Sequence, residues 1–331
     1  MEILLILVIF ASFLSTLLVM PAWIRKAKQI DLVWEDMNKL PREKNVAGSG
    51  GIAVVLGAMV GIFLYIALQT FYFKSIDGTL IKIFAIICSV LLVSGIGFID
   101  DLFGWKKGGL SIRSRIILVL FSAIPLMVIN AGESTIFGIE FGIIYPLIIV
   151  PLGILGATTT YNFLAGFNGL ESSQGIIILS ALAFVTYTTG NSWLSVILLC
   201  MVASLLAFYI FNKNPAKVFP GDVLTYSVGI LIAITAILGN IEKITLFFFI
   251  PYILEMILKS RGKLKKHSFG IPNTYGSLEM PYEKIYGLEH LAIKILKKIK
   301  PSHKVYESEV VWLINGFQIL IILIGMLIFL R

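Results

Sequence analysis

The sequence predicts an all-α, polytopic membrane protein with ten transmembrane helices, and three observations support this fold class. Of the 331 residues, 58% are hydrophobic and only 14% are charged, and the mean hydropathy is +0.93. A soluble domain has about 45–50% apolar and about 25% charged residues, so a soluble protein of this size is excluded. The apolar residues form segments long enough to cross a bilayer, which takes about 20 helical residues. The basic residues, finally, are confined to alternate loops.

Ten segments are expected to span the membrane, because each is apolar over a window of about 19 residues. In chain order they are 3–24, 50–70, 80–99, 116–132, 142–161, 174–189, 192–211, 223–239, 244–258 and 309–330. The first is interpreted as a membrane helix rather than a signal peptide, since no basic residue precedes it and Arg25, Lys26 and Lys28 follow it. The whole chain, 1–331, is thus predicted to form a single integral-membrane domain.

The loops between these spans fall into two sets of very different charge. Twenty-three of the 27 Lys and Arg residues lie in one set, and four lie in the other set together with the termini. The basic set comprises the loops 25–49, 100–115, 162–173, 212–222 and 259–308. Because basic loops stay in the cytoplasm, we expect these five loops to be cytoplasmic and both termini to lie outside. The middles of the spans hold almost no ionisable residue, which argues against a pump and favours an enzyme or a structural protein.

The loop 100–115 opens with two adjacent carboxylates, Asp100 and Asp101. They repel each other and lie at the negative end of a helix dipole, so a divalent cation or nearby basic residues should compensate them. The loop contains four basic residues, Lys106, Lys107, Arg113 and Arg115. Metal or phosphate chemistry is one interpretation of this pattern, and a solvated helix end with basic partners is the other.

The loop 162–173 carries hydroxyls, amides and glycines but no Lys or Arg. Asn162 and Asn168 are six residues apart, and Gly166 and Gly169 permit a turn that brings both amides towards one point. Neutral amides suit an uncharged base or a hard cation. Ordinary turn residues would explain the same pattern.

The loop 212–222 places Lys217, Phe219 and Asp222 within six residues. Asp222 is expected either to ligate a metal ion or to act as the N-cap of the next helix. Phe219 is a candidate stacking platform for a base, with an ordinary interfacial aromatic as the alternative.

The loop 259–308 contains 11 Lys or Arg residues and all three histidines of the chain. Its segment 284–300 has a helical apolar period and a cationic face, and is expected to lie on the membrane surface. The stretch 259–283 is a candidate lid that carries His267, although a merely exposed histidine fits this position too.

At these loops the sequence resembles the polyprenyl-phosphate N-acetylhexosamine-1-phosphate transferases. The resemblance rests on the Asp-Asp pair after the third span and on the runs NFLAGFNGLE at 162–171, PAKVFPGD at 215–222 and LEMPY at 278–282. With the ten-span plan it covers nearly the whole chain, and it is strongest for the archaeal and eukaryotic branch. That branch implies transfer of GlcNAc-1-phosphate from UDP-GlcNAc to dolichyl or polyprenyl phosphate, with release of UMP. The product is a lipid-pyrophosphate sugar, the first membrane step of N-glycan or cell-surface glycan assembly.

The resemblance also implies roles for single residues. It implies a Mg²⁺ ion, with Mn²⁺ as the alternative metal, held by Asn162 and Asp222, and it places the catalytic Asp100 and Asp101 beside the metal and the lipid phosphate. The other implied contacts are Phe219, Asn168, Leu170 and Gly221 with the nucleotide, Arg115, Lys106 and Lys107 with phosphate, and Lys266 and His267 with the sugar. The implied partners are a UDP-sugar, a polyprenyl phosphate and membrane lipid, with no nucleic acid. The sequence does not decide whether the protein forms a homodimer.

Alternatives remain for the donor, the function and the mechanism. The lid has Lys266-His267-Ser268 where the family has Arg-His-Arg, so another UDP-N-acetylhexosamine is an alternative donor. A transporter or flippase of lipid-linked sugars is the alternative function, although the spans have few polar interruptions. We expect direct attack by the lipid phosphate, whose second pKa of about 6 leaves it mostly dianionic near pH 7. A phospho-enzyme is the competing scheme.

Overall fold

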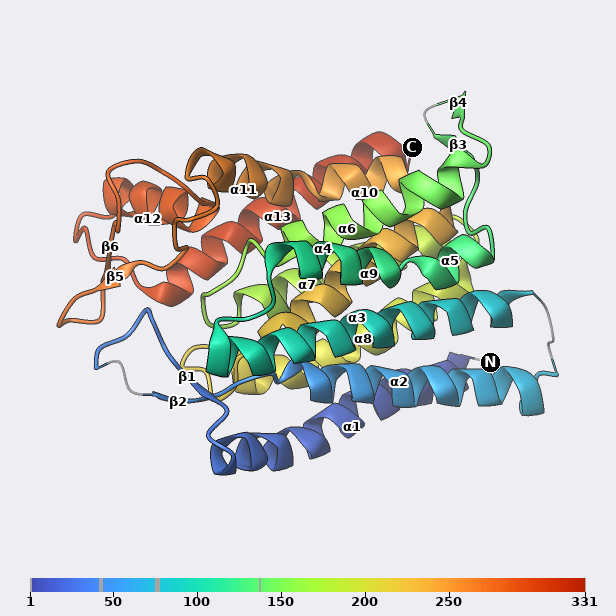
Figure 1. Cartoon of the computed structure of the whole chain (residues 1–331), viewed down its shortest axis with the longest axis horizontal. Coiled ribbons are helices and arrows are strands. Elements are labelled where there is room, and N and C mark those ends of the chain that lie inside the picture. Colours follow the sequence, from blue (N-terminus) through green and yellow to red (C-terminus); the bar gives the residue numbers. More distant parts are fainter. Residues whose placement is uncertain (1, 42–43, 75–77, 137, 331) are drawn as a thin grey trace.

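Long helices run along the length of the molecule in a computed structural model that describes residues 2–41, 44–74, 78–136 and 138–330 (Figure 1). The helices are α1 (Glu2–Gln29), α2 (Gly51–Ala67), α3 (Thr79–Lys107), α4 (Ile112–Phe121), α5 (Ile124–Val128), α6 (Val150–Tyr161), α7 (Leu170–Thr188), α8 (Ser192–Asn212), α9 (Gly221–Gly239), α10 (Glu242–Phe248), α11 (Ile250–Arg261), α12 (Leu288–Ile299) and α13 (Glu307–Phe329). Two π-helical segments, η1 (Leu68–Tyr72) and η2 (Tyr145–Ile149), follow α2 and precede α6. The prediction of a mainly helical membrane protein is confirmed.

Seven helices among the described residues are long and apolar enough to cross a membrane. They are Leu4–Gln29, Gly51–Tyr72, Thr79–Gly104, Leu170–Thr188, Ser192–Asn212, Gly221–Gly239 and Glu307–Phe329. Each coincides with a predicted span. The three remaining predicted spans, 116–132, 142–161 and 244–258, are helical but shorter: 142–161 contains one apolar helix over Tyr145–Tyr161, and each of the other two is divided into two helices.

Prolines account for two of these interruptions. Pro125 and Pro251 lie in the first turn of α5 and α11, each directly after a break, whereas Pro151 lies where η2 continues directly into α6. Proline has no N–H donor and clashes with the preceding turn, so it is tolerated in the first turn of a helix and kinks or breaks a helix further along. The expectation of ten single spanning helices is therefore too simple for these three segments.

Three short two-stranded antiparallel sheets lie between helices among the described residues, and the chain remains mainly helical, as the predicted all-α class requires. Strand β1 (Val33–Glu35) pairs with β2 (Lys44–Ala47), β3 (Thr135–Ile136) with β4 (Ile139–Glu140), and β5 (Ile271–Pro272) with β6 (Leu278–Glu279). Strands β1, β2, β5 and β6 gather with α12 at one end of the molecule, which we call the loop end (Figure 1). Both chain ends lie at the opposite end.

Helix α9 forms the centre of the bundle, since every residue from Val223 to Gly239 is buried. It packs against α2, α3 and α6. The close approach of α3 depends on Gly97, where a β-carbon would lie only 2.6 Å from the carbonyl carbon of Asp222. Small residues permit such contacts between helices in a membrane, where close packing drives association. The contact places the C-terminal end of α3 beside the first turn of α9.

Helix α12 confirms the helical period predicted for 284–300. Its residues Leu288, Ala292 and Ile293 are buried, and the helix packs against α11 and α13. Lys294 and Lys298 are exposed on the other face. Its location on a membrane surface stays a prediction.

Candidate active site

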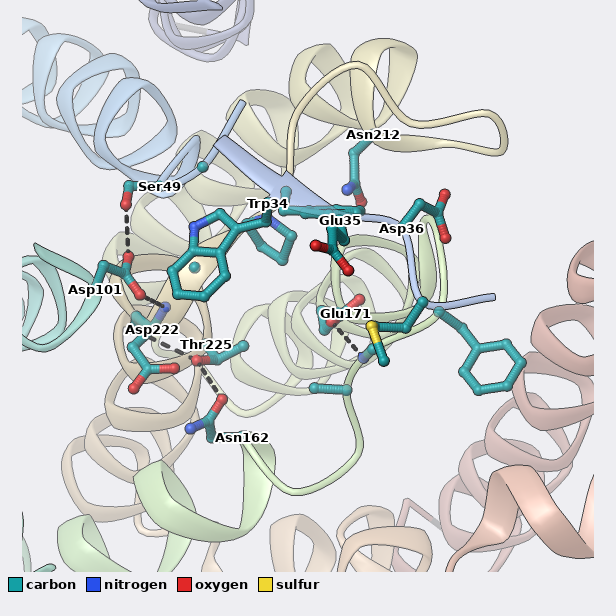
Figure 2. A pocket seen from close by; sticks show the side chains of 18 of the residues that line it. Trp34, Glu35, Asp36, Ser49, Asp101, Asn162, Glu171, Asn212, Asp222 and Thr225 are labelled. Carbon is teal, nitrogen blue, oxygen red and sulfur yellow. Dashed lines mark hydrogen bonds between the residues drawn. The ribbon is translucent and has the colours of Figure 1, made fainter. Parts of the chain in front are cut away.

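A cavity of about 590 Å³ opens at the loop end, and all five of the basic loops contribute to its wall (Figure 2). The lining residues come from 33–37 and 48–49 in the first loop, 101 in the second, 162, 165–167 and 171 in the third, 212 and 219–222 in the fourth, and 267 and 269 in the fifth. Thr225, one turn into α9, completes the lining. The fold therefore brings together at one site the polar loops that the charge pattern placed on one side of the membrane.

The wall of this cavity is acidic. Its described lining includes the carboxylates Glu35, Asp36, Asp101, Glu171 and Asp222, and it includes no Lys or Arg. This described lining therefore offers an anionic ligand no Lys or Arg as a partner, and a cation bound at the carboxylates would supply the missing positive charge.

Asp101 lies at the C-terminal end of α3 and connects two other segments. Its Oδ2 accepts a 2.9 Å hydrogen bond from Oγ of Ser49, and its Oδ1 accepts a 2.8 Å hydrogen bond from the backbone N–H of Asp222. This N–H lies in the first turn of α9, where backbone donors lack partners within the helix. Figure 2 shows how the carboxyl group joins the first loop to the start of α9.

Gly221 is the residue that allows this arrangement. Its φ of +69° lies in the left-handed region, which side chains other than glycine rarely adopt. A β-carbon at this position would also overlap Oδ2 of Asp101. Only glycine therefore lets the chain enter α9 with Asp101 in place.

Asp222 and Asn162 face the same part of the cavity. The N-cap of α9 is Pro220, so the interpretation of Asp222 as an N-cap is wrong. Oγ1 of Thr225 shares its proton between Oδ1 of Asn162, at 3.0 Å, and the carbonyl oxygen of Asp222, at 3.4 Å. Asn162, which follows α6, is thereby oriented towards the start of α9 (Figure 2).

The side-chain oxygens of Asp222 and Asn162 fit a hard cation that is bound by protein and substrate together. The described residues contain no group of three or more His, Cys, Asp or Glu that could hold a metal ion. Mg²⁺, however, commonly takes one or two carboxylates and fills its shell with water and substrate phosphates. Asp222 and Asn162 supply such oxygens, and Asp100, Asp101 and Asp222 interact electrostatically with one another. The site thus resembles an open Mg²⁺ site rather than a closed protein cage.

Asp100 does not line the cavity and pairs with Arg115 instead. Only 2% of Asp100 is exposed, and its Oδ2 lies 2.7 Å from Nε of Arg115. Its Oδ1 accepts hydrogen bonds from Nη2 of Arg115 at 3.1 Å and from the N–H of Leu110 at 2.6 Å. Burial disfavours the charge of Arg115, but Asp100 and its neighbours outweigh this effect and raise the pKa of Arg115 above its usual value. The adjacent carboxylates Asp100 and Asp101 therefore have different surroundings.

Of the predicted phosphate contacts Arg115, Lys106 and Lys107, only Arg115 has a side chain that the structure describes. Arg115 does not line the cavity. Lys106 and Lys107 end α3, and their side chains lie outside the described part of the chain.

Phe219 lines the cavity, and both its backbone N–H and its backbone carbonyl oxygen are hydrogen-bonded to the first loop. Its N–H donates to the carbonyl oxygen of Ala47 at 2.8 Å, and its carbonyl oxygen accepts from the N–H of Gly50 at 2.9 Å. A parallel bridge between Ala47 and Val218 extends the contact from the end of β2 into the fourth loop. The first loop therefore holds the backbone at Phe219 in place beside the cavity.

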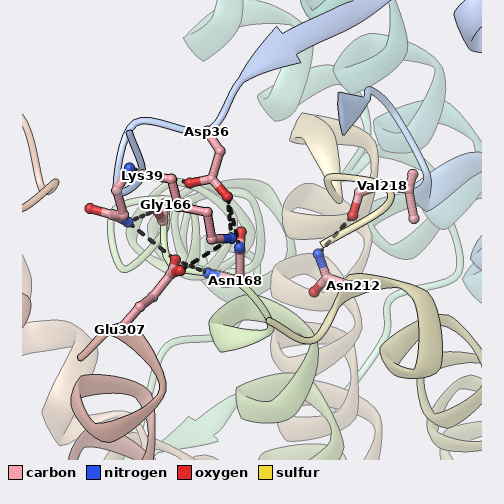
Figure 3. Close-up of polar contacts among 8 residues, drawn as sticks. Asp36, Lys39, Gly166, Asn168, Asn212, Val218 and Glu307 are labelled. Atoms are coloured by element: carbon pink, nitrogen blue, oxygen red, sulfur yellow. Dashed lines mark hydrogen bonds and ion pairs between the residues drawn. The ribbon is translucent and has the colours of Figure 1, made fainter. Parts of the chain in front are cut away.

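Asn168 and Leu170 do not line the cavity. Asn168 is 5% exposed; its Nδ2 donates to Oδ2 of Asp36 at 2.9 Å, and its N–H donates to Oε1 of Glu307 at 2.7 Å (Figure 3). Leu170 begins α7 and is completely buried. The structure thus places both residues behind the wall of the cavity.

The candidate lid reaches the cavity through His267 and Phe269. The two rings stack with their centroids 6.5 Å apart. The backbone N–H of His267 donates a 3.3 Å hydrogen bond to the hydroxyl oxygen of Tyr282. Lys266 does not line the cavity, and its Nζ lies 4.7 Å from the ring centre of Tyr282. Tyr282 therefore anchors this part of the lid.

Several polar lining residues were not predicted from the sequence, among them Ser49, Thr225 and Glu171. Thr225 could have been found, because it lies three residues after Asp222 and so on the same helix face. Oε1 of Glu171 accepts a 2.8 Å hydrogen bond from the N–H of Gly166, and no local pattern indicates this role.

Comparisons with known proteins show which proteins this chain is similar to. Residues 83–240 match the model of the family described as glycosyl transferase family 4. A provisionally named UDP-N-acetylglucosamine–dolichyl-phosphate N-acetylglucosaminephosphotransferase of Saccharolobus solfataricus is 36% identical over 293 residues, which are 86% of this chain and 85% of that protein. The enzyme of that name from Dictyostelium discoideum is 27% identical over 320 residues, 83% of this chain and 74% of that protein. A phospho-N-acetylmuramoyl-pentapeptide-transferase of Streptococcus thermophilus is 28% identical over 284 residues, with 78% and 81% covered.

Proposed function

Because the chain belongs to glycosyl transferase family 4, we propose that it transfers GlcNAc-1-phosphate from UDP-GlcNAc to dolichyl phosphate or a related polyprenyl phosphate. The relatives from S. solfataricus and D. discoideum are named for the same substrates. The products are UMP and a lipid-pyrophosphate-linked GlcNAc. The chain is a phosphoglycosyltransferase of the membrane.

One observation carries the proposal: an acidic cavity lies where five polar loops meet at the end of a bundle of apolar helices. The acceptor is a lipid that cannot leave the bilayer, whereas the donor is a water-soluble nucleoside diphosphate sugar. A cavity at the end of the spans is where both can be bound. The acidic wall matches a donor whose phosphates arrive with a divalent cation.

We assign Asn162 and Asp222 to Mg²⁺, with Mn²⁺ as the alternative. The bound cation neutralises the phosphates of the donor, which the described wall cannot do because it has no Lys or Arg. Phosphoryl transfer depends on positioning and charge neutralisation more than on covalent chemistry by the protein. Arg115, Lys106 and Lys107 remain our candidates for phosphate contacts from the second loop.

The reaction balances without a strong base. An oxygen of the lipid phosphate bonds to the β-phosphorus of the donor, and the bond from this phosphorus to the oxygen shared with the α-phosphate breaks. UMP leaves with that electron pair. The acceptor is mostly dianionic near pH 7, because its second pKa is about 6. We assign the orientation of the acceptor phosphate to Asp101, which faces the cavity, and the placing of Arg115 to Asp100.

The remaining cavity residues are assigned to the donor. Phe219 is the stacking platform for the uracil, and Gly221 keeps the backbone close to the nucleotide. His267 contacts the sugar phosphate from the lid, with Lys266 beside it. Asn168 and Leu170 support the third loop from behind.

We also propose that the cavity faces the cytoplasm and that the chain crosses the membrane ten times, with both termini outside. This topology is supported by the 23 of 27 basic residues in the five loops and by the position of both chain ends opposite the loop end (Figure 1). A single cysteine at the exposed Lys263 tests it. An impermeant maleimide should label this cysteine in inverted vesicles, and labelling in right-side-out vesicles instead contradicts the topology.

Purified protein with UDP-GlcNAc, dolichyl phosphate and Mg²⁺ tests the function. UMP should form only in the complete mixture, and EDTA should stop its formation. No UMP in the complete mixture contradicts the proposal. UDP-GalNAc and UDP-glucose in the same assay test the sugar, and faster release from either changes the donor assignment.

Direct attack is tested separately with donor labelled in the β-phosphate. Without lipid acceptor, the protein should stay unlabelled. Label bound to the protein after denaturation would show a phospho-enzyme instead.

A further inference from the structure

Asn38 lies behind the wall of the cavity and bonds to three other segments. Its Nδ2 donates hydrogen bonds to the carbonyl oxygen of Gly166 at 2.9 Å and to Oε1 of Glu307 at 3.3 Å. Its Oδ1 accepts a 3.1 Å hydrogen bond from the N–H of Gly270. Only 2% of Asn38 is exposed. The side-chain amide therefore uses both of its donor hydrogens and its carbonyl oxygen inside the protein.

These contacts connect three parts of the cavity wall. Gly166 lines the cavity itself, Gly270 follows the lining residue Phe269, and Met37, which also lines it, precedes Asn38. Asn38 does not line the cavity. A displacement of its amide would therefore move the first loop, the third loop and the lid relative to one another, without removing any group that touches a ligand.

Charged neighbours hold Asn38 in place, and Figure 3 shows three of them, Asp36, Lys39 and Glu307. Oδ1 of Asp36 accepts from the N–H of Asn38 at 3.2 Å, and Oδ2 of Asp36 accepts from Nζ of Lys39 at 2.5 Å. Nζ of Lys39 also lies 3.6 Å from Oε2 of Glu307. Two carboxylates thus flank one lysine, so a third negative charge at this place would be poorly compensated.

We propose that Asn38 is a positioning residue that sets the affinity of the cavity for the nucleotide-sugar donor, by joining the first loop, the third loop and the lid. The inference rests on the proposed function, which makes a UDP-sugar the ligand of the cavity. A planar amide offers two donors and an acceptor in fixed directions, and neither a carboxylate nor a methyl group reproduces this set.

Two substitutions test the inference. Asn38→Asp keeps the shape of the side chain but turns an acceptor towards Gly166 and Glu307. Asn38→Ala removes the three hydrogen bonds without adding charge. For both, we expect the KM for UDP-GlcNAc to rise by about tenfold or more, since a buried hydrogen bond corresponds to about that factor. The kcat and the KM for dolichyl phosphate should stay within about twofold.

Asn45→Ala is the matched control. Asn45 belongs to the same loop, is exposed, and accepts a 2.8 Å hydrogen bond from Lys28 without contact to the cavity. This variant should keep all three kinetic constants of the wild type.

The outcomes separate positioning from folding and from the proposed function. A purely structural role lowers the fraction of active enzyme and hence the apparent kcat, but it leaves the donor KM unchanged. An unchanged donor KM in the Asn38 variants overturns the inference, and so does the loss of cooperative thermal unfolding in both. The wild type is measured first: if it releases no UMP, the proposed function fails rather than the role of Asn38.

Discussion

The backbone N–H of Asp222 donates a 2.8 Å hydrogen bond to Oδ1 of Asp101, although the two residues are 121 positions apart. A carboxyl group at the end of α3 thereby satisfies a backbone donor in the first turn of α9. The two helices approach closely enough for this contact because Gly97 and Gly221 carry no side chain. The geometry of the site thus depends on the meeting of two helix ends.

Gly221→Ala should abolish most of the activity. The new methyl group would overlap Asp101, and the φ of +69° would be strained. UMP release should fall by about a hundredfold or more, because small displacements of reacting groups have effects of this size. Gly95→Ala is the control, since a β-carbon at Gly95 meets nothing within 4 Å. Activity near that of wild type in Gly221→Ala would contradict the geometry described here.

Asp222→Asn should weaken the use of Mg²⁺ while preserving the fold. The substitution keeps the backbone N–H that bonds Asp101, so α9 should begin as before. The Mg²⁺ concentration for half-maximal activity should rise by about tenfold or more. Glu140→Gln, an exposed residue of β4, is the matched control. An unchanged Mg²⁺ requirement would remove Asp222 from the proposed ligands.

Arg115→Met should destabilise the protein. It leaves the buried carboxylate of Asp100 without its 2.7 Å partner, and an unpaired buried polar group costs about 1–3 kcal/mol. The midpoint of thermal unfolding in detergent should therefore fall. Arg113→Met, an exposed change in the same helix, should leave the midpoint unchanged. Equal midpoints for both variants would show that the Asp100–Arg115 pair does not contribute to stability.

His290 should make stability depend on pH. Burial and the nearby Lys259 lower the pKa of His290 from 6.5 to about 4, and Nδ1 accepts a 3.4 Å hydrogen bond from Tyr286, as a neutral ring can. Between these pH values the unfolded chain binds a proton that the folded protein does not bind, so the free energy of unfolding decreases as the pH is lowered. The full contribution is present above a pH of about 6.5 and is lost as the pH falls towards about 4.

Unfolding midpoints measured from pH 7 to pH 4 check this prediction. This range begins above the ordinary pKa of histidine, which is about 6.5. His290→Gln should flatten the pH dependence, whereas the exposed His303→Gln should not. A pH dependence that is the same in His290→Gln and wild type would refute the assignment.

Much of the fold could be predicted from the sequence because bilayer thickness sets the length of a spanning helix and loop charge groups the loops that lie together. Seven spans agree with long helices, and the five basic loops meet at one cavity. The breaks in 116–132 and 244–258 could also have been anticipated from Pro125 and Pro251.

The candidate site was only partly predictable. Asp101, Asn162, Phe219 and Asp222 line the cavity, and their residue types indicated this. The placement of Asn168 behind the wall could not be foreseen, because its partners Asp36 and Glu307 are 132 and 139 residues away. The Asp-Asp pair is equally ambiguous in sequence, and only packing separates a buried Asp100 from an Asp101 at the cavity.

The most direct test of the central claim is the fate of two labels on one donor molecule. UDP-GlcNAc labelled in both the sugar and the β-phosphate is incubated with dolichyl phosphate, Mg²⁺ and the purified protein, and the lipid product is extracted. Transfer of GlcNAc-1-phosphate predicts that both labels enter the lipid in the ratio of the donor and that unlabelled UMP is released. Sugar label in the lipid with the β-phosphate label left in UDP would contradict the account.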